Sequence, residues 1–157
     1  MKKSLVLLLI SSLVSGLYAR QPRTVVEPPF AFRNSGTLEI KRIELAPEST
    51  TVYIQAYFRP HNWIRISSET YIRAGAEGEK LTVRSADGMP LDTEFYMPET
   101  GRHDFSLSFP PVDPKTAKID LIESDCPDCF KIYDIDLTGK KWTPIGKGST
   151  SESGYQG

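Results

Sequence analysis

Residues 51–58 read Thr-Val-Tyr-Ile-Gln-Ala-Tyr-Phe, and this stretch decides the fold class. Apolar side chains occupy every second position from Val52 to Phe58, while Thr, Tyr and Gln fill the positions between them. Successive side chains point to opposite faces of a β-strand. The spacing therefore predicts a strand with one face in the core and one face toward solvent.

The same period of two returns along the chain after residue 36. The other alternating apolar positions are Leu38 and Ile40, Ile64 and Ile66, Leu81 and Val83, Phe105, Leu107 and Phe109, Ile119 and Leu121, and Tyr133, Ile135 and Leu137. Clusters of Gly, Pro, Asp and Asn separate these runs, and no longer window favours a helix. A sheet with one apolar face must bury that face against a second sheet. The pattern therefore predicts an all-β fold, an antiparallel immunoglobulin-like β-sandwich of about seven to eight strands.

The first run contains a change of phase. Leu38 and Ile40 share one phase of the alternation, whereas Ile43 and Leu45 share the other. A β-bulge at Lys41 or Arg42 would turn all four apolar side chains toward the core.

The N-terminus has the layout of a cleavable secretory signal. Two lysines precede an apolar run from Leu5 to Ile10, and the segment ends at Ala19, after which we expect cleavage. The run is shorter than the roughly 20 residues that span a bilayer, so we expect no membrane anchor and a secreted or periplasmic product. We divide the chain into a signal peptide (1–19), an extended N-terminal arm (20–36), the β-sandwich domain (37–145) and a disordered tail (146–157).

The charge balance excludes one class of partner. The 20 acidic residues slightly outnumber the 19 basic ones, and no cluster of Lys and Arg interrupts the pattern. A nucleic-acid-binding protein would carry such a cluster, so we expect no nucleic-acid partner and a monomeric protein.

Cys126 and Cys129 are the two cysteines of the chain, separated by Pro127 and Asp128. A Cys-x-x-Cys pair can be a structural disulfide, a redox catalyst or half of a zinc site. The alternating residues that follow favour a strand over the helix N-terminus that lowers the pKa of a catalytic thiol, and Glu123, Asp125 and Asp128 add negative charge. The sequence favours a local disulfide, with no metal and no cofactor.

No other motif indicates catalysis. A Gly-x-Ser-x-Gly elbow, a phosphate-binding loop and a His-Glu-x-x-His helix are all missing from the sequence, and His61 and His103 have no ligand spacing. We therefore expect a protein that is not an enzyme. The outward phase of the strand at 51–58 suggests a candidate binding face for a protein or carbohydrate ligand, made of Tyr53, Tyr57, Arg59 and Trp63. Trp63 is alternatively a core residue, as in many immunoglobulin-like domains.

Three segments carry a resemblance to a known family. They are 57–66, 97–111 and 122–133, with Arg59-Pro60-His61-Asn62-Trp63, Phe109-Pro110-Pro111 and Phe130-Lys131-Ile132-Tyr133 at their centres. Residues 36–140 resemble the immunoglobulin-like domain at the N-terminus of secreted bacterial TlpA-type thioredoxin-like proteins, here without the catalytic domain. The resemblance implies a fold and a compartment.

Two functions stay open at this point. The first is a secreted, non-catalytic binding or accessory module with one local disulfide. The alternative is an accessory or fragment of a thiol-disulfide oxidoreductase system that uses the Cys126 and Cys129 pair.

Overall fold

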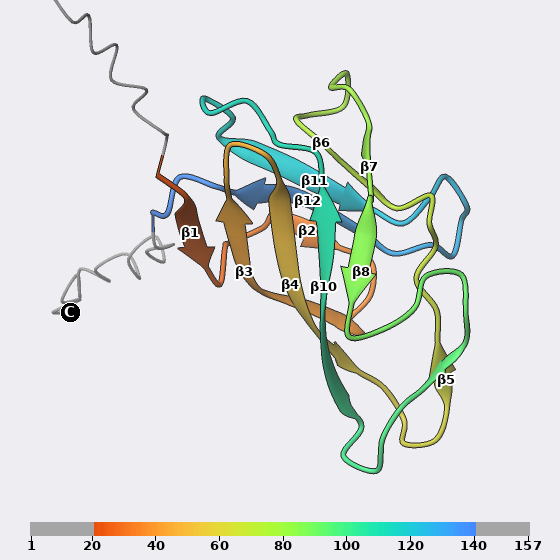
Figure 1. The fold of residues 1–157 in the computed structure, drawn as a ribbon. Coiled ribbons are helices and arrows are strands. Elements are labelled where there is room, and N and C mark those ends of the chain that lie inside the picture. Colours follow the sequence, from red (N-terminus) through yellow and green to blue (C-terminus); the bar gives the residue numbers. More distant parts are fainter. Residues whose placement is uncertain (1–20, 141–157) are drawn as a thin grey trace, which may run out of the picture.

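The structure, a computed structural model, describes residues 21–140, which form antiparallel β-strands and no helix (Figure 1). The first sheet has the order β1 (Arg23–Val26), β3 (Leu38–Leu45), β4 (Thr50–Tyr57), β10 (Arg102–Phe109) and β8 (Ser85–Asp87). The second has the order β2 (Phe32–Arg33), β12 (Lys131–Asp136), β11 (Lys118–Ile122), β6 (Tyr71–Arg73) and β7 (Leu81–Thr82). A third sheet pairs β5 (Trp63–Ile64) with β9 (Phe95–Tyr96). Within residues 21–140 there is no helix long and apolar enough to cross a membrane.

The all-β, antiparallel prediction is confirmed, but the expected number of seven to eight strands is wrong. The described residues contain 12 strands in three sheets. The additional strands are β1, β2, β6, β8 and β9, which have two to four residues each. Strands this short show little alternation in a sequence.

A single apolar core lies between the two large sheets. The alternation along β4 places Val52, Ile54 and Ala56 inside, as the sequence predicts. The second sheet closes the core with side chains of its own strands, Ile72, Ile119, Leu121, Ile132 and Ile135. Burial of this kind of surface stabilises the fold by about 25 cal/mol for each Å² of apolar area.

The β-bulge predicted in the first run is confirmed. The pairing of β3 with β4 shifts between Ile40 and Arg42, so Lys41 is the additional residue. The shift turns Ile43 inward, where it is fully buried, and leaves Leu45 packed against the core.

The segment 20–36 is expected to be an extended arm, and its described residues, 21–36, contribute to both large sheets. β1 pairs with β3 in the first sheet, and β2 pairs with β12 in the second (Figure 1). The segment between them therefore crosses from one sheet to the other, and Val25 joins the buried residues. The predicted signal peptide (1–19), the disordered tail (146–157) and the domain limit at residue 145 lie outside the described residues.

A second irregularity lies in β12, where the sequence predicts Tyr133 and Ile135 on one face. Ile132 and Ile135 are both buried, while Tyr133 is half-buried. Asp134 takes a left-handed conformation with φ of 54°, and its N–H donates to Oδ1 of the buried Asp120 at 3.0 Å. This bond holds the irregular turn of the strand that brings both isoleucines into the core.

Candidate functional site

The third sheet presents two aromatic rings to solvent. Trp63 pairs with Tyr96, and Ile64 pairs with Phe95. Ile64 is buried and Phe95 packs against the core, so this pair forms the inner face of the small sheet. Trp63 and Tyr96 therefore occupy the outer face, where they are 49% and 61% exposed. We call Trp63 and Tyr96 the aromatic pair.

The backbone hydrogen bonds show how Trp63 and Tyr96 are paired. Met97 N–H donates to Asn62 O at 2.9 Å, which makes Asn62 and Met97 a hydrogen-bonded position of the ladder. Positions alternate in an antiparallel ladder, so Trp63 and Tyr96 form the non-hydrogen-bonded kind of pair. Side chains approach each other most closely in pairs of this kind.

Among the exposed aromatic side chains of residues 21–140, the aromatic pair and Phe58 are those without a stacking partner. Among residues 21–140, no ring or cation stacks on Trp63 or Tyr96. The covered rings and their partners are Tyr53 with Arg42, Tyr71 with Lys80, Phe30 with Arg33, Phe32 with Tyr133 and Phe95 with His103. The guanidinium carbon of Arg42 lies 3.4 Å from the Tyr53 ring centroid, which blocks that ring face.

The structure distributes the four residues of the predicted binding face over three places. Tyr53 and Tyr57 lie on the outward face of β4, where both are half-buried. Their hydroxyl groups donate to Glu44 and Gln55, respectively. Arg59 is exposed in the loop after β4, and Trp63 lies in the third sheet. The alternative prediction that Trp63 is a core residue is wrong, because half of it is exposed.

Sequence reasoning missed Tyr96, the partner of Trp63. Phe95 and Tyr96 form a strand of two residues, and the strand they pair with lies more than 30 positions earlier in the chain. No local pattern encodes a pairing of this separation. The alternation around Ile64 and Ile66 would have placed Trp63 outward, and that signal was available.

Gly101 holds the beginning of the loop that leads from β4 to Trp63. Phe58 N–H donates to Gly101 O at 3.0 Å, immediately after β4 ends at Tyr57. Phe58 thereby leaves the alternation and is 40% exposed, although the sequence predicts it to face the core. Gly101 has φ of +64°, and a Cβ at this position would lie 2.8 Å from Phe58 O. Only glycine fits here without strain.

Four polar residues flank Trp63 and Tyr96 in the sequence, and one of them, Glu94, contacts the aromatic pair. Nε2 of His61 lies 2.6 Å from Oε2 of Glu99, and both side chains are largely exposed. The Tyr96 hydroxyl donates to Glu94 at 3.1 Å, and this hydrogen bond raises the pKa of Tyr96. Asn62 donates from Nδ2 to Pro60 O at 3.1 Å. We call His61, Asn62, Glu94 and Glu99 the polar rim.

The backbone of the rim is strained at one point. His61 has φ of 62°, a left-handed conformation that is uncommon for residues other than glycine. The His61 N–H donates to Met97 O at 3.0 Å, which ties the strained residue to the strand of Tyr96. Strain of this kind clusters at ligand-binding positions, which makes the rim a candidate site.

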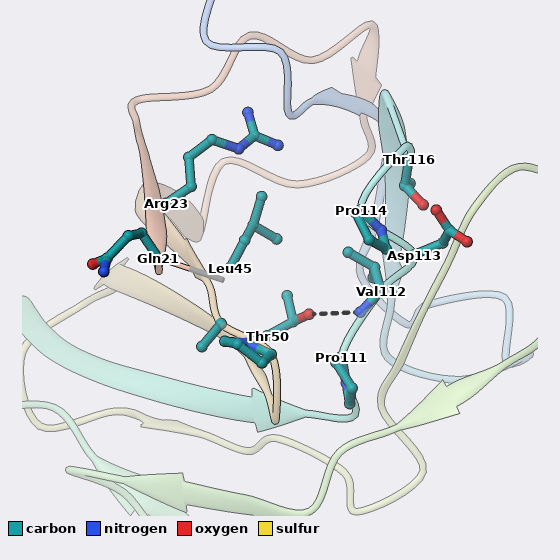
Figure 2. A pocket seen from close by; sticks show the side chains of 11 residues that line it. Gln21, Arg23, Leu45, Thr50, Pro111, Val112, Asp113, Pro114 and Thr116 are labelled. Atoms are coloured by element: carbon teal, nitrogen blue, oxygen red, sulfur yellow. Dashed lines mark hydrogen bonds between the residues drawn. The ribbon is translucent and has the colours of Figure 1, made fainter. Parts of the chain in front are cut away.

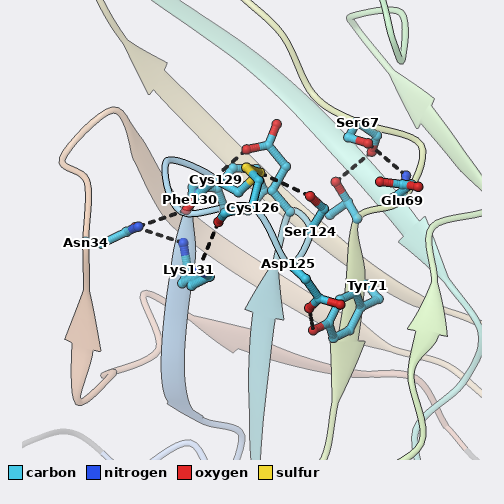
Figure 3. Close-up of a disulfide and its surroundings, with 12 residues drawn as sticks. Asn34, Ser67, Glu69, Tyr71, Ser124, Asp125, Cys126, Cys129, Phe130 and Lys131 are labelled. Atoms are coloured by element: carbon cyan, nitrogen blue, oxygen red, sulfur yellow. Dashed lines mark hydrogen bonds between the residues drawn. A yellow bond between two sulfur atoms is a disulfide. The ribbon is translucent and has the colours of Figure 1, made fainter.

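The cysteine pair forms a disulfide in the connection between β11 and β12, with 5.2 Å between the Cα atoms (Figure 3). Cys129 is buried, whereas Cys126 is exposed. Asn34 holds the loop from the neighbouring strand: its Nδ2 donates to Cys129 O at 2.8 Å, and its Oδ1 accepts from Lys131 N at 2.8 Å. The disulfide therefore ties a strand connection that is also anchored by Asn34, the residue that follows β2.

A cavity of about 440 Å³ lies beside Cys126 and is also lined by Tyr71, Lys80 and Asp125. Nζ of Lys80 lies 3.1 Å from Asp125, which raises the pKa of Lys80 and lowers the pKa of Asp125. One of the acidic neighbours expected around the thiols is therefore paired with a cation. Glu123 accepts a hydrogen bond from Phe130 N at 3.2 Å, and burial raises its pKa.

Two further hollows lie near the N-terminal strand. A cleft of about 400 Å³ lies beside Arg23, between Pro47 and the turn at residues 111–114, and Val112 N–H donates to Thr50 there (Figure 2). A groove of about 1020 Å³ follows residues 24–30 and includes the exposed Val26. Phe30 in this groove is covered by Arg33 at 5.3 Å. Neither hollow contains a nucleophile beside a base.

The two histidines lie in different environments. His61 pairs with Glu99, and Nε2 of His103 lies 2.6 Å from Gly88 O. In the part of the chain that the structure describes, no three His, Cys, Asp or Glu side chains converge as metal ligands do. No known protein family, curated protein or solved structure gives a significant match to the chain.

Proposed function

We propose that the protein is a secreted, non-catalytic binding module with an immunoglobulin-like β-sandwich fold, and that the aromatic pair is its ligand-binding site. The pairing of Trp63 and Tyr96, which are 49% and 61% exposed, carries this proposal. Aromatic side chains offer a large contact area and have few rotamers to restrict, so exposed rings are favourable anchors for a ligand. The other exposed rings with a stacking partner, Phe30 and Phe32, have part of that area already occupied.

The position of the site in the fold supports the proposal. The beginning of β1 and the end of β12 lie on one side of the molecule, and β5 lies on the other (Figure 1). Arg23 donates to Leu137 O, which keeps the two described ends of the chain together. A ligand on the aromatic pair would therefore not meet the segments through which the chain enters and leaves the fold.

The environment of the histidines favours binding over catalysis. A hydrolase of the serine or cysteine type needs a histidine hydrogen-bonded to its nucleophile. Within residues 21–140, His61 contacts a carboxylate and His103 contacts a backbone carbonyl, and neither contacts a hydroxyl or a thiol.

The proposal is tested by an array that carries oligosaccharides and apolar peptides. Wild-type protein should bind at least one probe, and the Trp63→Ala/Tyr96→Ala variant should lose that binding. Phe32→Ala is the matched control, because Phe32 is 55% exposed on another surface. Binding that survives in the double variant, or binding of no probe at all, would contradict the proposed site.

One observation favours the second candidate, an accessory role in thiol-disulfide exchange. Cys126 is exposed and borders a cavity, so a thiolate of a partner protein has access to its sulfur. In such an exchange the partner thiolate attacks Cys126, and Cys129 leaves as a thiolate. Reduction of the disulfide by dithiothreitol at an equilibrium potential above about −270 mV would favour this candidate, because structural disulfides typically lie below about −300 mV.

A further inference from the structure

We propose that the segment 141–145 docks into the groove beside β1, with the indole of Trp142 against Val26 and Phe30. The segment reads Lys-Trp-Thr-Pro-Ile and follows Lys140, the last described residue. No residue of the aromatic pair or of the polar rim lines this groove, so the proposal is independent of the proposed ligand-binding site.

The groove exposes apolar surface. Its volume is about 1020 Å³, and half of the residues that line it are apolar, namely Val25, Val26, Pro28, Pro29, Phe30 and Ile40. Val26 is 69% exposed and Phe30 is 40% exposed, and both belong to the six large apolar side chains that are exposed within residues 21–140. Apolar surface that is gathered in one place on a folded chain marks a position at which another segment or molecule docks.

The C-terminal end of the described chain leads into this groove. The Asp136 N–H donates to Pro29 O at 2.8 Å, which holds the end of β12 against the segment that follows β1. Gly139 and Lys140 then form part of the groove lining themselves. The next residues of the chain therefore begin at the border of the groove.

Trp142 is the first large apolar residue after the described part of the chain, two positions beyond Lys140. Two extended residues span at most about 7 Å, so the Cα atom of Trp142 stays within that distance of the groove lining. A large aromatic side chain buries about 150–250 Å² when it is covered. Trp142 therefore has both the reach and the apolar area to cover Val26 and Phe30.

The attachment of the segment favours it over a separate partner. A partner that binds from solution loses its translational and rotational freedom, whereas a segment of the same chain has already lost most of it. A short connection holds the segment at an effective concentration in the millimolar range. The segment 141–145 therefore occupies the groove ahead of a separate molecule of similar apolar area.

Docking would add apolar contacts to a strand that has few of its own. β1 is the outermost strand of the first sheet and pairs with β3. Val25 is its one buried residue. Contact of Trp142 with Val26 would join β1 to the chain that leaves β12, so the docked segment should contribute to the stability of the fold.

The sequence contains two tryptophans, so a Trp63→Phe background leaves Trp142 as the single tryptophan reporter. In this background acrylamide should quench Trp142 at least about twofold less steeply than it quenches the free peptide Lys-Trp-Thr-Pro-Ile, because docking covers on the order of half of the 150–250 Å² of the side chain. The Val26→Asp/Phe30→Ala variant should be quenched like the free peptide. Phe58→Ala is the matched control, because Phe58 is also 40% exposed but does not line the groove.

Urea denaturation of the full chain gives a second measurement. Trp142→Ala should lower the equilibrium constant of folding at least about tenfold, because it removes a large buried apolar side chain. The same substitution should have no effect in the Val26→Asp/Phe30→Ala background, because residues in contact show coupled effects. Tyr155→Ala, which changes an aromatic residue outside the segment 141–145, should leave the unfolding midpoint unchanged.

Three results would overturn the proposal. The first is quenching of Trp142 as steep as that of the free peptide. The second is protection of Trp142 that persists in Val26→Asp/Phe30→Ala, because the indole would then be covered elsewhere. The third is protection that increases with protein concentration together with a dimer in analytical ultracentrifugation, because a second copy of the chain would then supply the cover.

Discussion

Nε of Arg73 lies 3.1 Å from Oδ2 of Asp120, and this ion pair joins β6 to β11 across the second sheet. The side chain of Asp120 is 7% exposed, and its other oxygen accepts the N–H of Asp134. One carboxylate therefore satisfies a guanidinium on one neighbouring strand and the irregular turn of β12 on the other.

Asp120→Ala should lower the free energy of unfolding by about 3 kcal/mol, because it leaves a partly buried guanidinium and a backbone N–H without their acceptor. Urea denaturation would measure the loss. Glu99→Ala, which removes the exposed partner of His61, should leave the unfolding midpoint nearly unchanged. Equal effects of the two substitutions would show that burial of the Asp120 pair has no energetic consequence.

Substitution of three glycines by alanine should change the stability of the protein to three different extents. Gly36→Ala should be neutral or slightly stabilising, because Gly36 does not have a positive φ and has no atom within 4 Å of a new Cβ. Gly139→Ala should cost about 1 kcal/mol for a φ of +75° in open space. Gly101→Ala should cost about 2–3 kcal/mol, because the Cβ also meets Phe58 O. Chemical denaturation would rank the variants, and a Gly101 variant no worse than that of Gly139 would contradict the close approach.

Glu123 should make the stability of the protein depend on pH, with a sign that follows from its raised pKa. Burial raises the pKa of this carboxyl above its ordinary value of 4.5. Between the ordinary pKa and the raised one, the folded state holds a proton that the unfolded chain has released. The contribution of Glu123 to stability is therefore lost as the pH rises through this range. Glu123→Gln keeps an acceptor for Phe130 N–H and cannot ionise. The variant should gain stability relative to wild type between pH 4 and pH 7, whereas a constant difference in urea midpoints would refute the assignment.

The double substitution Cys126→Ser/Cys129→Ser should lower the free energy of unfolding by about 2 kcal/mol, the value that loop entropy gives for so short a ring. Asn34 still holds the loop through Cys129 O and Lys131 N, so the fold should persist. Urea denaturation would measure the cost. Ligand binding at the aromatic pair should not change, and its loss would mean that the disulfide acts beyond its own loop.

The predicted signal peptide implies a defined mature N-terminus. Expression of the full chain in a Gram-negative host should place the protein in the periplasm, and mass spectrometry should show it beginning at Arg20. Replacing Leu8 and Leu9 with arginine should keep residues 1–19 attached and the protein in the cytosol, because the apolar run is interrupted. An uncleaved chain in the periplasm would argue against cleavage after Ala19.

The alternation of apolar residues predicted which side chains of a strand face the core and where the β-bulge lies. The change of phase between Ile40 and Ile43 indicated the bulge at Lys41, because four apolar side chains near one another must reach the same core. The same rule places Trp63 outward, opposite in phase to the buried Ile64. The core alternative for Trp63 came from analogy with immunoglobulin-like domains, and here the simple period of two was the better guide.

Pairings between distant segments were not predictable. Tyr96 becomes part of the candidate site only because β9 pairs with β5, and strands of two residues leave no periodic signal. Phe58 left the alternation because its N–H finds Gly101 O after the strand ends. For the same reason the sequence could not show that residues 23–33 join two different sheets.

The outermost strands of the two large sheets are shorter than those they flank. β1 has four residues, β8 three, and β2 and β7 two each, whereas β3, β4 and β10 have eight. An exposed strand edge is a template for pairing with another chain, and a short edge offers few unpaired backbone N–H and C=O groups for such pairing. The protein should therefore resist fibril formation at high concentration, because its long strands β3, β4 and β10 are paired on both edges within the sheet.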